Sequence, residues 1–113
     1  MISAINLNTG EKVWARPLGS AIPGQNTGIT NFGGPIVTAA GLLFTAAAED
    51  PYIRAFDAAT GDEIWKHSLP VPAQSTPMTY TIEGRQYLVI AAGGHGDKAT
   101  KLGDSLVAFA LTP

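Results

Sequence analysis

The chain has 113 residues, of which 45% are apolar and 14% are charged, and its formal net charge is −2. This composition can bury a core, and the singly scattered Lys and Arg residues form no basic stripe of the kind that binds nucleic acid or an anionic membrane. Because the chain has no cysteine, disulfides, thiolate catalysis and zinc–thiolate sites are excluded. The sequence contains neither a signal-peptide pattern nor an apolar run near the roughly 20 residues of a membrane helix.

The first 18 residues predict a β-hairpin. Residues 2–7 alternate between apolar and polar side chains, Asn8, Thr9 and Gly10 form a turn, and residues 12–16 supply the returning strand. Residues 17–31 are rich in Gly, Pro, Asn and Thr. A loop of this length is either functional or disordered.

The middle of the chain, residues 34–69, predicts one complete four-stranded sheet. Its strands are expected at residues 36–38, 42–47, 52–57 and 63–67, joined by turns of hairpin size. After a link at residues 70–75, three more strands are expected at residues 76–82, 86–92 and 105–111. The predicted layout is therefore two strands in residues 1–18, four in residues 34–69 and three in residues 76–111.

One module occurs twice. Residues 4–18 read AINLNTGEKVWARPL and residues 55–69 read AFDAATGDEIWKHSL, with Trp14 and Trp65 in the same position. A repeat of about 50 residues built from strand, turn and strand predicts the blades of a β-propeller, so the chain is expected to be part of a longer protein. We expect both indoles to be largely buried against small residues of the adjoining blade.

The repeated pattern A-x-[DN]-x-x-T-G-x-x-x-W resembles the tryptophan-docking motif of the eight-bladed quinoprotein dehydrogenases, which use pyrroloquinoline quinone (PQQ). Five further segments resemble the C-terminal end of the membrane-bound PQQ-dependent glucose dehydrogenases: residues 31–44, 48–57, 76–80, 84–96 and 101–111. The AGGHG run around His95 separates this branch from the soluble methanol and ethanol dehydrogenases, which tend to carry Trp at that position. The resemblance implies an all-β chain that forms about two blades of an eight-bladed propeller.

The same resemblance implies a parent enzyme that oxidises glucose or a related sugar or polyol and passes electrons to ubiquinone. It implies a location on the periplasmic side of the bacterial inner membrane, with anchoring helices upstream of this chain. PQQ would act with a divalent cation, Ca or Mg, held mainly by residues outside the chain. The general base and the metal ligands of the family belong to upstream motifs, so no catalytic or metal-binding residue is expected here, and the isolated chain is expected to lack activity.

Four residues are candidates for contact with the cofactor. His95 lies in a glycine-rich loop that follows an apolar strand, and Asp50 lies in the turn before Pro51. Asn31 and Phe32 are the first residues of the NFGGP segment, which resembles the segment that borders the quinone ring in this family. Taken without the resemblance, His95 is a surface-loop histidine and Asp50 an ordinary turn residue.

Other patterns in the sequence indicate no further binding site. Residues 94–99 mimic a dinucleotide fingerprint, but too few residues follow for the helix that such a site needs. His67 and His95 have no carboxylate partner at ligand spacing, so no metal site is indicated. Three alternative functions stay open: a quinate or polyol dehydrogenase of the same family, a non-enzymatic propeller scaffold and an independent β-domain.

Because incomplete sheets expose edges and apolar faces, the chain is also expected to self-associate.

Overall fold

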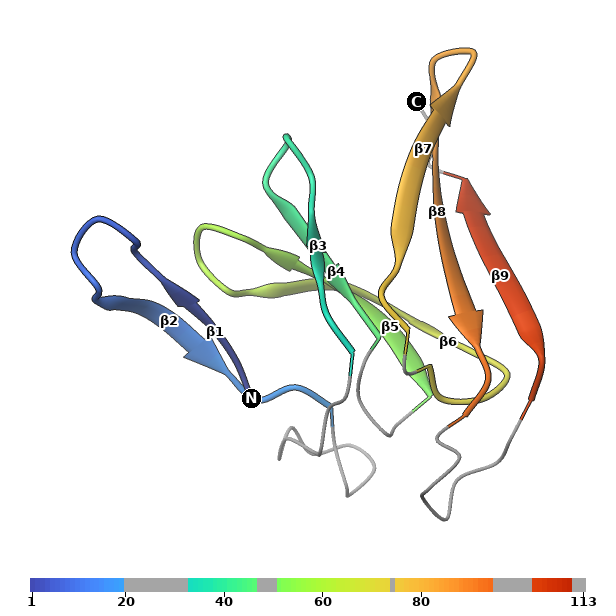
Figure 1. Cartoon of the computed structure of the whole chain (residues 1–113), viewed down its shortest axis with the longest axis horizontal. Helices are drawn as coiled ribbons and strands as arrows, with labels where there is room; N and C mark the ends of the chain where they lie inside the picture. Colours follow the sequence, from blue (N-terminus) through green and yellow to red (C-terminus); the bar gives the residue numbers. More distant parts are fainter. Residues whose placement is uncertain (20–32, 47–50, 74, 95–102, 111–113) are drawn as a thin grey trace.

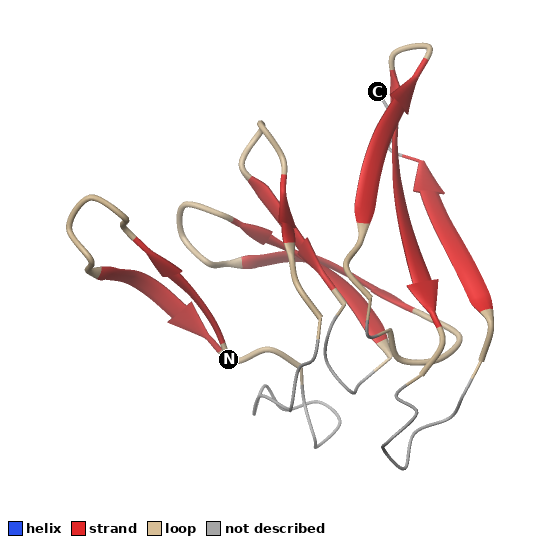
Figure 2. Cartoon of the chain, in the orientation of Figure 1, coloured by secondary structure: helices blue, strands red, loops and turns tan. Residues whose placement is uncertain are grey.

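The computed structural model describes residues 1–19, 33–46, 51–73, 75–94 and 103–110. These residues form nine strands in three separate antiparallel sheets, and they include no helix. The three sheets fan out side by side (Figures 1 and 2). In the part of the chain so described, no helix is long and apolar enough to cross a membrane. The all-β prediction is confirmed.

The strands fall into three groups along the chain. The first sheet pairs β1 (Ile2–Ile5) with β2 (Lys12–Arg16). The second has the order β3 (Ile36–Val37), β4 (Leu42–Thr45), β5 (Tyr52–Asp57), β6 (Glu63–Ser68). The third has the order β7 (Met78–Ile82), β8 (Arg85–Ala92), β9 (Ser105–Ala110).

The two copies of the repeated module close their turns with the same hydrogen bonds. In the first copy the Gly10 amide donates to the Asn6 carbonyl at 2.7 Å, and in the second the Gly61 amide donates to the Asp57 carbonyl at 2.7 Å. Gly10 and Gly61 have φ of +74° and +79°, a conformation that glycine adopts at little cost. Because Asn6 already belongs to the turn, β1 ends at Ile5 and not at the expected residue 7.

The main core lies between the second and third sheets. Phe44, Ile53 and Ala55 of the second sheet pack in one cluster with Leu88 and Ile90 of the third. The link between the second and third sheets, residues 69–77, adds Leu69, Val71 and Ala73 to the same cluster. Burial of this apolar surface is the dominant favourable term that holds the two sheets face to face.

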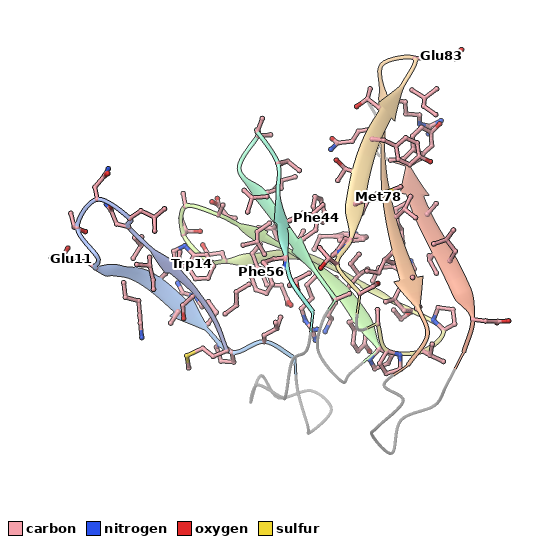
Figure 3. The ribbon with its side chains drawn as sticks, viewed as in Figure 1. Glu11, Trp14, Phe44, Phe56, Met78 and Glu83 are labelled. Carbon is pink, nitrogen blue, oxygen red and sulfur yellow. The ribbon has the colours of Figure 1, made fainter. Side chains whose placement is uncertain are left out.

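A second cluster joins the first and second sheets around Trp14, with Leu18, Leu43 and Phe56 (Figure 3). The Trp14 side chain is only 6% exposed, and its indole N–H donates to the Ala58 carbonyl at 2.9 Å. Two residues further along β2, the Arg16 guanidinium donates to the Thr60 carbonyl at 3.0 Å. The indole thus docks on the Thr-Gly turn of the next module.

Trp65 does not repeat this arrangement, so the expectation that both indoles are largely buried is wrong for this residue. Trp65 is 36% exposed, with Phe109 edge-on at 5.4 Å between ring centroids and Phe44 edge-on at 6.5 Å. The residue that corresponds to Ala58 in the third sheet is Leu111, which lies outside the described residues. Within the described part, the indole N–H of Trp65 has no hydrogen bond.

The outer face of the third sheet is apolar and exposed. Register pairs place Met78, Tyr80 and Leu106 on the face opposite the core, and Tyr80 stacks on Tyr87 at 5.3 Å. A soluble monomer seldom exposes a continuous apolar face of this kind.

We propose that the chain self-associates through this face. Sedimentation at micromolar concentration should show dimers or larger species, and Leu106→Asp should shift them toward monomer because Leu106 is 74% exposed on that face. Val37→Asp is the control, since Val37 is comparably exposed but lies on the second sheet. A monomeric wild-type chain would contradict the proposal.

Candidate functional site

The candidate residues Asn31, Phe32, Asp50 and His95 all lie outside the described residues, so their roles stay predictions. The described residues that flank them can be placed. β4 ends, and β3 and β5 begin, at one end of the second sheet, and β8 ends and β9 begins at the corresponding end of the third (Figure 1). The segments that carry the candidates therefore start from the same end of adjoining sheets.

The segment that contains Asn31 and Phe32 returns to the described fold at Gly33. The next residue, Gly34, donates its amide N–H to the Thr76 hydroxyl at 3.3 Å. Thr76 belongs to the link between β6 and β7, so the base of this loop is tied to the segment that leads into the third sheet, although the loop itself leads into the second.

Asp50 is followed directly by Pro51, which precedes β5. The Pro51 carbonyl accepts a hydrogen bond from the Leu69 amide at 2.7 Å. Leu69 is buried in the main core and begins the link to the third sheet. The base of this turn is consequently held by the same link as Gly34.

The segment that contains His95 starts at Gly94 and returns at Gly103. Gly94 has a φ of +77° and donates to the Pro72 carbonyl at 2.7 Å, while the Gly103 amide donates to the Gly93 carbonyl at 3.1 Å. A Cβ on Gly103 would come within 3.0 Å of the Val71 side chain. The backbone conformation therefore favours glycine at position 94 and close packing favours it at position 103, independently of any ligand.

The link, residues 69–77, is the part of this region that the sequence reasoning missed. The sequence indicated only a connection between strands, yet Val71, Pro72, Ala73 and Pro77 are buried. The available signal was the spacing of apolar residues and prolines in LPVPAQSTP, which is unusual for a solvated connection.

Two basic side chains of the second sheet contact partners within that sheet. Arg54 is 5% exposed and forms an ion pair with Glu63 at 2.9 Å, while Lys66 lies 4.7 Å from the centre of the Tyr52 ring. Among the described residues there is no cluster of three His, Cys, Asp or Glu side chains that could hold a metal ion. For PQQ, the described residues supply only the bases of the loops that carry the candidate residues.

Comparison with known proteins identifies the family of the chain. Residues 1–88 match the family described as glucose/ethanol/alcohol dehydrogenase, β-propeller domain. The chain is 44% identical to the quinoprotein glucose dehydrogenase of Escherichia coli (strain K12) over 97% of its own length. It is 45% identical to the glycerol dehydrogenase large subunit of Gluconobacter oxydans (strain 621H) over 98% of its length.

These relatives are much longer than this chain, which spans 15% of the first and 16% of the second. Among solved structures, a quinohemoprotein alcohol dehydrogenase from Pseudomonas putida HK5 superposes with a TM-score of 0.60 at 28% identity. The similarity covers 74% of this chain and 11% of that one. The repeated docking turn, the fanned sheets and these matches together show that the chain belongs to the β-propeller domain family of the PQQ-dependent quinoprotein dehydrogenases.

Proposed function

We propose that this chain is part of a PQQ-dependent dehydrogenase that oxidises glucose or a related sugar or polyol. The observation that supports it most strongly is the identity of 44% to a quinoprotein glucose dehydrogenase across nearly the whole chain. Within the enzyme, the chain would contribute the packing between blades and one part of the wall around the cofactor.

On this proposal, Asn31, Phe32, Asp50 and His95 face the cofactor, carried by loop bases that gather at one end of the sheets. When bound, PQQ supplies a two-electron acceptor for the hydride equivalent of a substrate C–H bond. The general base and the ligands of a divalent cation, Ca or Mg, would come from other parts of the enzyme. Electrons would pass to ubiquinone at the periplasmic side of the inner membrane, where helices elsewhere in the longer protein would anchor the enzyme.

Two other functions are compatible with the same fold. A quinate or polyol dehydrogenase would use the same fold, and the identity of 45% to a glycerol dehydrogenase subunit favours a polyol as the second candidate. A non-enzymatic propeller scaffold would share the docking tryptophans but has no physical reason to keep the NFGGP and AGGHG segments.

The proposal is tested with the full-length protein that contains this chain, purified without cofactor and titrated with PQQ. His95→Ala should weaken PQQ binding about tenfold, the loss of one hydrogen bond to a charged or polar ligand group. Its melting temperature should stay close to that of the wild type. Dye reduction with glucose, glycerol and quinate then ranks the substrates, and the isolated chain should give no turnover.

His67→Ala is the matched control, because His67 is exposed on β6 with its Nδ1 2.8 Å from the neighbouring Ser68 carbonyl. Unchanged PQQ affinity in His95→Ala, together with a fall of several degrees in melting temperature, would assign a structural role to His95. Wild-type protein that binds no PQQ would contradict the proposed function itself.

A further inference from the structure

The link between the second and third sheets, residues 69–77, contacts the bases of all three candidate loops. Its Leu69 amide donates to the Pro51 carbonyl at 2.7 Å, its Pro72 carbonyl accepts from Gly94 at 2.7 Å, and its Thr76 hydroxyl accepts from Gly34 at 3.3 Å. The three segments are far apart in the sequence, and this link is the element that touches the described base of each.

The link is anchored in the core between the second and third sheets. Val71 and Ala73 are buried in the core between the second and third sheets, so the link cannot shift without opening that core. Proline at positions 70, 72 and 77 fixes φ at three of its residues and reduces the conformations open to it. The Ser75 hydroxyl also donates to the Ala91 carbonyl of β8 at 2.9 Å, which fastens the link to the strand that leads to Gly94.

We propose that residues 69–77 are the positioning element of the candidate cofactor wall, and that Thr76 is its positioning residue. Thr76 neighbours Ser75, so adjacent side chains of the link hold the base of the Asn31–Phe32 segment and the strand before His95. A displacement at one base would then be transmitted to the other through a short segment that buried Val71 and Ala73 anchor in the core. The coupling is a property of the described residues, whereas its effect on PQQ rests on the proposed function.

The first test uses the ¹⁵N-labelled chain and the amide signals of Gly34 and Gly94. Thr76→Val removes the hydroxyl at nearly constant shape and should move both signals, and Thr76→Ser should restore both. Thr38→Val is the control, because the Thr38 hydroxyl accepts from Leu42 at the same distance of 3.3 Å but lies at the opposite end of the second sheet. A Gly94 signal that stays in place while Gly34 moves would overturn the coupling.

The second test measures PQQ affinity by titration of the cofactor-free, full-length protein. Thr76→Val should raise the dissociation constant by about threefold or more, with the free energy of one hydrogen bond, equivalent to about tenfold, as the upper limit of the effect. Thr76→Ser and Thr38→Val should leave it close to wild type. Unchanged affinity in Thr76→Val would overturn the positioning role. Failure of the wild-type protein to bind PQQ would instead contradict the proposed function, and the amide signals would still decide whether the link couples the loop bases.

Discussion

Replacement of Trp14 by alanine should lower the free energy of unfolding of the chain by about 3–5 kcal/mol, the usual cost of truncating a large aromatic residue in a core. The indole is 6% exposed, packs on Phe56 and Leu43, and satisfies its N–H on the Ala58 carbonyl at 2.9 Å. Truncation therefore removes apolar contact and leaves the half-buried Ala58 carbonyl without its donor. Urea unfolding followed by circular dichroism measures the loss.

Trp65→Ala is the matched comparison because the two residues hold the same position in the repeat. Trp65 is 36% exposed and its indole N–H has no hydrogen bond among the described residues, so its truncation should cost only about 1–2 kcal/mol. Trp14→Phe should cost about 1–2 kcal/mol on account of the lost hydrogen bond and smaller ring. Equal losses for Trp14→Ala and Trp65→Ala would show that docking on the next module contributes little.

The strands could be predicted well because local signals decide them. Residues 52–57 alternate in polarity and end at a Thr-Gly turn, and β5 has those bounds. The strand expected from residue 76 begins instead at Met78. Pro77, which has no N–H to donate to a neighbouring strand, lies in the link, and Thr76 uses its side chain to bind Gly34.

The environment of the two tryptophans could not be predicted from the repeat alone. The similarity of the two modules predicts the position of each tryptophan within its own sheet, but it does not predict which residues of the next sheet lie opposite the indole. Trp14 meets the Asp57–Asp62 turn of the following module. The corresponding stretch for Trp65 begins at Ala110, and from Leu111 onward it lies outside the described residues. Burial of a docking residue depends on its neighbour, which a motif does not specify.

The candidate site could be predicted only as a set of residues. The resemblance indicates Asn31, Phe32, Asp50 and His95, and the fold brings the bases of their segments to one end of adjoining sheets. The role of the link was hidden because its contacts are backbone hydrogen bonds from Leu69 and to Pro72, which any residue with the same backbone can make. Side-chain chemistry therefore gave no signal there except the hydroxyl of Thr76.

Gly61→Ala should be among the most destabilising single substitutions of a small residue in this chain. A Cβ at Gly61 would lie 2.5 Å from Cδ2 and 2.6 Å from Cε3 of Trp14, so the docked ring would have to move. Gly61 also has a φ of +79°, which costs an alanine about 1–2 kcal/mol. With about 1–3 kcal/mol for the overpacked contact, the free energy of unfolding should fall by about 2–5 kcal/mol.

Gly10→Ala separates these two contributions, because Gly10 has nearly the same φ, +74°, and a Cβ there would meet nothing within 4 Å. It should cost only the conformational part, about 1–2 kcal/mol. In a Trp14→Ala background the clash is absent, so Gly61→Ala should then cost the same as Gly10→Ala, and a double-mutant cycle isolates the contact. If Gly61→Ala and Gly10→Ala cost the same in the wild-type background, the indole does not rest on Gly61 in solution, and the docking of one module on the next would have to depend on the Ala58 hydrogen bond and the surrounding apolar contacts alone.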